Sequence, residues 1–169
     1  MFMRKKNNKE SGLTLIEVVV AIGIFGLVVS MAFGVFGLAL TSQRRIIALK
    51  NVEDNARFAI ELMAREIRTG KDFSGGIGSL SFMNAKSELI VYRLNNNIIE
   101  KSFDGGASYL PITGSEATID YLNFYLTGQA ADDGLQPRIT ITIGATSQVS
   151  NQSANLRIQT TISERFLQS

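Results

Sequence analysis

Residues 13–40 form an unbroken apolar run of 28 residues that contains no Lys, Arg, Asp or Pro. A membrane-spanning helix needs about 20 consecutive apolar residues, so this run is long enough to cross a bilayer. Its only formal charge is Glu17. An ionisable group held in hydrocarbon costs roughly 2.5–3.5 kcal/mol on insertion scales. We therefore expect Glu17 to serve a specific partner, because a plain anchor has no need of it.

A short basic leader precedes the run. Residues 1–12 hold four basic residues and one acidic residue, a net charge of +3, whereas the other 157 residues hold 13 basic and 14 acidic ones. The basic pI therefore comes from the leader, and no direct nucleic-acid ligand is expected. The leader cations, set against Arg44 and Arg45, favour a cytoplasmic N-terminus. A secretory signal peptide is a poor match, since its apolar stretch is about half as long and ends in an A-x-A-like site.

The composition argues against an enzyme. The chain has no Cys and no His, which removes thiolate and imidazole metal ligands and the usual nucleophile and base pairs. Asp132 and Asp133, before Gly134, are weak candidates for calcium ligands. An Asp near a Gly is more often a turn, and the spacing does not match a dedicated calcium loop. We predict no catalysis, no cofactor and no metal centre.

Gly12-Leu13-Thr14-Leu15-Ile16-Glu17-Val18, following Lys5, Lys6 and Lys9, resembles the class III signal of type IV prepilins and type II secretion pseudopilins. The resemblance implies that a prepilin peptidase cuts between Gly12 and Leu13 and that the new amine of Leu13 is methylated. Glu17 then matches the family's glutamate, which pairs with the N-terminus of a neighbouring subunit. Leu13 departs from the pattern, because Phe is commoner there.

The resemblance also implies partners and a location. The partners are the prepilin peptidase, other pilins or pseudopilins, and the inner-membrane assembly platform with its ATPase. The protein is expected to be a single-pass membrane protein with an extracytoplasmic domain, and afterwards part of a filament. The alternative is a membrane-anchored binding protein or enzyme that uses the span only as a tether, which leaves Glu17 without a function.

Small residues recur along the apolar run at spacings of three and four, which places them on one side of a helix. Such a stripe lets helices approach closely in a membrane, although glycine is also ordinarily tolerated in membrane helices. The predicted packing positions are Gly23, Gly26, Ser30, Gly34 and Gly37.

After Thr41 the pattern becomes that of an amphipathic helix. Gly70 occupies the position of a C-terminal cap, and no Pro occurs before Pro111, so a continuous helix over 13–69 is predicted. Its buried face is expected to contain Leu49, Val52, Ala56, Ala59 or Ile60, Met63 and Ile67.

The rest of the chain has the pattern of short strands at 80–83, 88–94, 98–103, 119–126, 138–143 and 155–166. We expect a hairpin turn at residues 95–97 and a mobile loop at 146–154. The predicted fold is α+β: a long N-terminal helix packed on a C-terminal antiparallel sheet, which is also the pilin architecture. The predicted divisions are a leader (1–12), a transmembrane and assembly helix (13–40), an amphipathic helix (41–70) and a β domain (71–169). Residues 56–68 and 137–141, with the Thr-Thr-Ile-Ser-Glu-Arg ending, are similar to J-type pseudopilins and W-type minor pilins.

Overall fold

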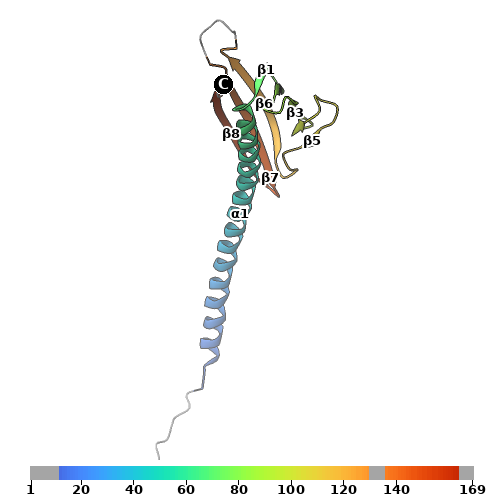
Figure 1. Ribbon diagram of the computed structural model, residues 1–169. Helices are drawn as coiled ribbons and strands as arrows, with labels where there is room; N and C mark the ends of the chain where they lie inside the picture. The colour runs from blue at the N-terminus through green and yellow to red at the C-terminus, as the bar shows by residue number, and fades with distance from the viewer. Residues whose placement is uncertain (1–11, 130–135, 164–169) are drawn as a thin grey trace, which may run out of the picture. The chain divides into compact units, whose positions relative to one another are not determined.

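The structure is a computed structural model that describes residues 12–129 and 136–163. Within those ranges it contains one helix, α1 (Leu15–Ile67), followed by strands β1 to β8 (Figure 1). The chain divides into two compact units, Met1–Ser42 and Gln43–Ser169. The second unit is a folded α+β domain, formed by the remainder of α1 and the strands.

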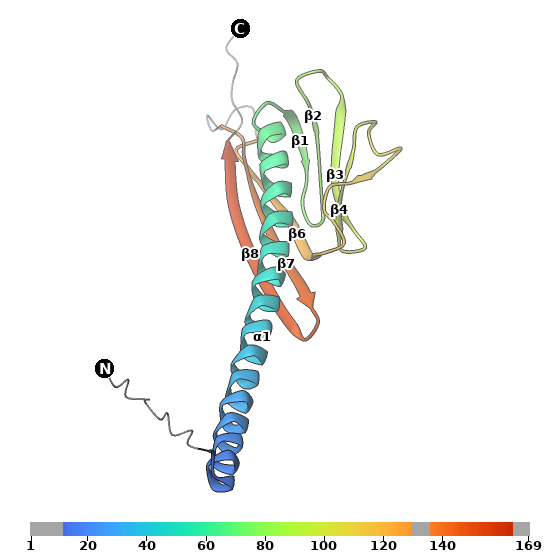
Figure 2. The same cartoon turned by 90° about the horizontal axis from the view of Figure 1, so that it is seen from below.

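The strands form two antiparallel sheets, where the sequence had suggested one. The first contains β1 (Lys71–Gly75), β2 (Ser79–Met83), β3 (Leu89–Asn95), β4 (Ile98–Ser102) and β5 (Leu110–Pro111), in that order. The second contains β6 (Thr118–Thr127), β7 (Arg138–Val149) and β8 (Gln152–Ser163). In Figure 2, β1 to β4 lie on one side of α1 and the upper part of β8 lies on the other, while the β7–β8 hairpin crosses the helix in this view. The predicted class, a long helix on antiparallel β structure, is confirmed.

The two sheets are tied together by the loop between β1 and β2. The amide of Gly78 donates to the carbonyl of Leu122 at 2.8 Å, and the amide of Phe124 donates to the carbonyl of Gly76 at 2.9 Å. The carbonyl of Leu122 and the amide of Phe124 both belong to β6, which is an edge strand of the second sheet. The two bonds therefore satisfy part of the unpaired edge of β6. A single core can therefore extend over both sheets.

That core is centred on one face of α1 in residues 43–67. The buried helix positions recur every three or four residues, as a helix packed on one side requires, and three of the six are alanines, which let strands approach closely. They are Ala48, Val52, Ala56, Ala59, Met63 and Ile67. The prediction for Leu49 is wrong: Leu49 is exposed, and Ala48 continues the spacing of the buried face instead.

The helix ends close to the predicted residue but for a different reason. Gly70 does not adopt the left-handed conformation of a glycine cap, as its φ is not positive. A Cβ at Gly70 would instead lie 2.5 Å from Cδ2 of Phe82, whose ring is fully buried. Glycine is therefore needed at this position because the β2 aromatic ring packs directly on the backbone.

Two connections between strands were predicted from the sequence, with different outcomes. The turn after β3 is confirmed: Asn96 and Asn97 have φ of 47° and 63°, the conformation of a two-residue hairpin that asparagine tolerates well. The predicted mobile loop at 146–154 is wrong. Those residues continue β7 and start β8, with a turn only at Ser150 and Asn151. The short strands β1 and β5 were not predicted.

A polar cluster joins the last turn of α1 to the first sheet. Lys101 on β4 is buried and forms a salt bridge with Glu66 on α1, and the hydroxyl of Tyr92 on β3 donates to the other oxygen of Glu66 at 2.7 Å. The ammonium group of Lys101 also lies 4.1 Å from the centre of the Phe103 ring. All three polar groups are thus satisfied inside the domain, as buried charges require.

Candidate functional site

The N-terminal end of α1 carries the predicted processing and assembly residues. Gly12 and Leu13 precede the helix, and the carbonyl of Thr14 accepts hydrogen bonds from the amides of Glu17 and Val18 at 3.1 and 3.2 Å. The amide of Glu17 also donates to Thr14 Oγ1 at 3.4 Å. Thr14 is therefore the N-cap of α1, which explains why the helix begins at Leu15 and not at Leu13.

The spacing of Thr14 and Glu17 also contains a helix-start signal that was not predicted from the sequence. Thr-x-x-Glu is the pattern of a capping box, in which the third helical residue is Glu or Gln. Glu17 also lies in the first turn, where a negative charge is favoured by the helix dipole. The charge of Glu17 is consequently favourable to the start of the helix, in addition to any function toward a partner.

Glu17 is surrounded by exposed apolar side chains. Leu13 and Glu17 line one shallow apolar hollow together with Val18 and Ala21. These residues are all exposed, as is nearly every other residue of the apolar run. A carboxylate is thus presented on a surface that is otherwise suited only to lipid or to another apolar helix.

The predicted small-residue stripe lies wholly within α1. A Cβ added at Gly23, Gly26, Gly34 or Gly37 would meet no atom within 4 Å. Ser30 donates its hydroxyl to the carbonyl of Leu27 at 2.8 Å, so its polar group is satisfied within the helix. The stripe is open to an approaching helix, and its use in helix packing stays a prediction.

The candidate calcium ligands Asp132 and Asp133 lie outside the described residues. In the part of the chain that the structure covers, no group of three or more acidic residues is placed to hold a metal ion. Asp104, the other Asp followed by glycines, organises a turn: its carboxylate accepts hydrogen bonds from the hydroxyl of Ser102 at 2.6 Å and the amide of Ser108 at 2.9 Å. These bonds, from Ser102 first and then Ser108, lower the pKa of Asp104 well below its ordinary value.

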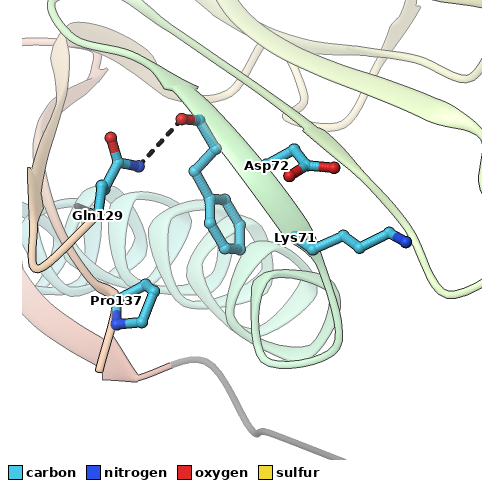
Figure 3. Close-up of a pocket in the computed structure, with 5 residues that line it drawn as sticks. Lys71, Asp72, Gln129 and Pro137 are labelled. Atoms are coloured by element: carbon cyan, nitrogen blue, oxygen red, sulfur yellow. Dashed lines mark hydrogen bonds between the residues drawn. The ribbon is translucent and has the colours of Figure 1, made fainter. Parts of the chain in front are cut away.

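A surface hollow of about 260 Å³ lies beside β1 and is lined by Lys71, Asp72, Phe73, Gln129 and Pro137 (Figure 3). Its wall is held by the side chain of Gln129, which donates to the carbonyl of Phe73 at 3.0 Å. Asp72 has a φ of 57° at the irregularity in the β1–β2 pairing. These five residues contain no pairing of a nucleophile with a base that would support catalysis.

Taken together, the fold and the N-terminal residues define a class of protein: an α+β domain that follows one apolar helix long enough to cross a membrane. Residues 7–33 match the family model of the prokaryotic N-terminal methylation motif. The matched range includes Gly12, Leu13 and Glu17, and it supports a membrane-anchored, type IV pilin-like precursor. Searches of curated proteins and of solved structures gave no significant match.

Proposed function

We propose that this chain is a non-enzymatic minor pilin or pseudopilin. A prepilin peptidase cuts it between Gly12 and Leu13, the new amine is methylated, and the subunit joins a type IV pilus or a type II secretion pseudopilus. The observation that carries the proposal is the methylation-motif match over residues 7–33, with Glu17 as the only charge in the exposed apolar helix. Similarity of residues 56–68 to J-type pseudopilins and W-type minor pilins favours that subgroup.

Cleavage places a positive charge beside the start of α1. An α-amino group has a reference pKa of about 7.7–8.0, so it is largely cationic at neutral pH, and methylation leaves the charge in place. At Leu13 this charge precedes the N-cap Thr14, next to the positive end of the helix dipole. An unpaired cation is unfavourable there, so the amine requires a nearby carboxylate.

Glu17 supplies that carboxylate, and the bilayer makes the pairing intermolecular. In hydrocarbon, an isolated charge is costly and two opposite charges attract far more strongly than in water. The carboxylate of Glu17 is exposed on the helix surface, where it can meet the amine of a neighbouring subunit. Cleavage therefore creates the charge that favours assembly.

The proposal includes a location and partners. The leader stays in the cytoplasm, the domain from Gln43 onward is extracytoplasmic, and the processed subunit is passed to the assembly platform and its ATPase. Its helix packs against those of other pilins, with the stripe from Gly23 to Gly37 facing a neighbouring helix.

The test separates the charge of Glu17 from its capping function. Glu17→Gln keeps the capping-box pattern, which accepts Gln as well as Glu, but removes the charge. Thr14→Ala removes the cap, at a cost of about 1 kcal/mol of helix stability, and keeps the charge. The protein is expressed with a prepilin peptidase and companion pilins, and processing is followed by intact mass.

Both variants should lose the first twelve residues and carry a methylated Leu13. Incorporation, measured by cross-linking to companion pilins, should fail in Glu17→Gln and persist in Thr14→Ala. A simple tether would behave alike in both variants. Undiminished incorporation of Glu17→Gln would refute the charge pair, and an intact Met1 would end the proposal as a whole.

A further inference from the structure

The turn between β7 and β8 lies beside the start of the folded domain. Nη1 of Arg44 donates to Oγ of Ser150 at 3.4 Å, which connects the turn to α1. The two strands stay paired up to Val149 and Gln152, so the turn is carried on a regular hairpin. Its exposed residues are polar: Gln148, Ser150, Asn151 and Ser153.

The charged residues that belong to the hairpin and to the adjoining part of α1 are basic. Residues 138–163 contain two arginines and no acidic residue, and the only charges between residues 18 and 52 are Arg44, Arg45 and Lys50. Two acidic residues of the preceding segment lie beside the end of β7: the carboxylate of Asp120 accepts a hydrogen bond from Thr146 at 2.8 Å, and the backbone carbonyl of Glu116 accepts one from the hydroxyl of Ser147 at 2.5 Å. Arg44, Arg45 and the turn therefore contribute only positive charges of their own, and they are rich in hydrogen-bond donors.

Chain length alone keeps this surface close to the membrane. The helical part of the apolar run begins at Leu15, and its 26 residues to Leu40 measure about 39 Å, more than the hydrocarbon core of about 30 Å and close to the bilayer with its headgroups, about 40–45 Å. The end of the apolar run at Leu40 thus reaches the headgroup layer. Arg44 follows after four residues, which can span about 14 Å at most in any conformation. The Ser150 turn lies on Arg44, so it shares this limit.

We propose that this surface, which we name the headgroup surface (Arg44, Arg45, Gln148, Ser150 and Asn151), binds anionic phospholipid headgroups of the membrane that holds the span. Arginine matches phosphate oxygens with paired donors, and the hydroxyl and amide groups of the turn add further donors. The inference needs only the single membrane span and holds whether or not the protein assembles as a pilin. It gives the β7–β8 hairpin a function in seating the domain on the bilayer before assembly.

The absence of native cysteine allows a direct test on the full chain. A single cysteine replaces Asn151 at the turn or, as the matched control, Lys86 in the β2–β3 turn. Both sites are exposed, and the control lies at the other end of the domain, since Phe82 packs on Gly70 just after α1 ends. Each is labelled with an environment-sensitive fluorophore in vesicles of phosphatidylcholine and phosphatidylglycerol that contain a headgroup spin-labelled quencher.

The label at Asn151→Cys should be quenched and the label at Lys86→Cys should not. Each basic residue near an anionic surface shifts such a contact by about fivefold, so Arg44→Gln with Arg45→Gln should lower the bound fraction more than about tenfold. Vesicles of phosphatidylcholine alone, or high salt, should have a similar effect. Equal quenching at the two sites overturns the proposal. Quenching at residue 151 that is unchanged by Arg44→Gln with Arg45→Gln overturns it as well.

A second protein could cover the turn instead of lipid. The label is therefore also followed as the protein-to-lipid ratio is lowered at constant lipid composition. Quenching at residue 151 that persists at high dilution supports lipid contact. A signal that changes with protein density and not with phosphatidylglycerol content assigns the turn to a second copy of the chain and overturns the inference. The quenching experiments do not depend on whether Glu17→Gln assembles. The proposal on lipid binding and the proposal on pilin assembly can therefore be refuted independently of each other.

Discussion

The salt bridge between Lys101 and Glu66 predicts an unequal response to removing its two charges. The side chain of Lys101 is 5% exposed and that of Glu66 is 23% exposed. Glu66→Gln keeps the shape of the acceptor but leaves a buried ammonium group without its carboxylate. Lys101→Met removes the buried charge itself, and the remaining carboxylate still reaches water and still accepts the hydrogen bond from Tyr92.

The magnitudes follow from burial. Removing one partner of a buried ion pair costs about 3–5 kcal/mol, and because Glu66 is partly exposed we expect the lower end, about 3 kcal/mol, for Glu66→Gln. Lys101→Met should cost about 1–2 kcal/mol, as a typical destabilising substitution does. The double variant replaces the pair by neutral groups of similar size, which is often nearly neutral, so it should be about 1–2 kcal/mol more stable than Glu66→Gln alone.

The assay is urea unfolding of the four proteins in detergent, followed by circular dichroism and read as a double-mutant cycle. The control is the Arg57–Glu53 pair, whose side chains are 64% and 48% exposed. Glu53→Gln should change stability by less than about 0.5 kcal/mol, because exposed pairs contribute little. If Glu66→Gln costs no more than Glu53→Gln, or if the double variant shows additive losses, the account of the buried pair is wrong.

Two further predictions concern the same side of the domain. Gly70→Ala should lower the free energy of unfolding by about 1–3 kcal/mol, because the new Cβ meets a ring of Phe82 that is enclosed by Phe73 and Tyr92; an unchanged urea midpoint would contradict the close packing. Burial, and then the hydrogen bond to Glu66, raises the pKa of Tyr92 above its ordinary value. The folded chain therefore keeps a proton that the unfolded chain loses above pH about 10, so stability present below that pH falls by up to about 1.4 kcal/mol per unit as pH rises. Tyr92→Phe should remove this part of the alkaline slope, and an identical slope in both proteins would show that Tyr92 ionises freely.

The sequence predicted best those features that depend on neighbouring residues. The helix over 15–67 follows from 53 residues without Pro, and the turn at Asn96 and Asn97 follows from the tolerance of asparagine for positive φ. The candidate site is equally local, since Gly12, Leu13 and Glu17 lie within six residues. The N-cap at Thr14 could have been predicted from the Thr14–Glu17 spacing alone.

The errors arose where tertiary contacts outweigh local pattern. Residues 146–154 are polar enough to resemble a loop, yet they form strands because β7 and β8 pair along their whole length and satisfy each other's backbone groups. Leu49 fits the apolar spacing as well as Ala48 does, and only the position of the strands decides which one is buried. The cluster of Glu66, Tyr92 and Lys101 could not be predicted, because its members are 26 and 35 residues away from Glu66 in the chain.

The contrast between local patterns and tertiary contacts also explains why the match to the family model covers only the N-terminal residues. The family match stops at residue 33, inside the apolar helix. On the proposed function, a peptidase recognises Gly12 and assembly requires the carboxylate of Glu17, so the residue type is restricted at these positions up to that point. Beyond it, the core requires apolar side chains of suitable volume, and many sequences meet that requirement. A domain of this kind can therefore keep its fold while its sequence changes, and its surfaces can be altered for new partners without disturbing the N-terminal helix.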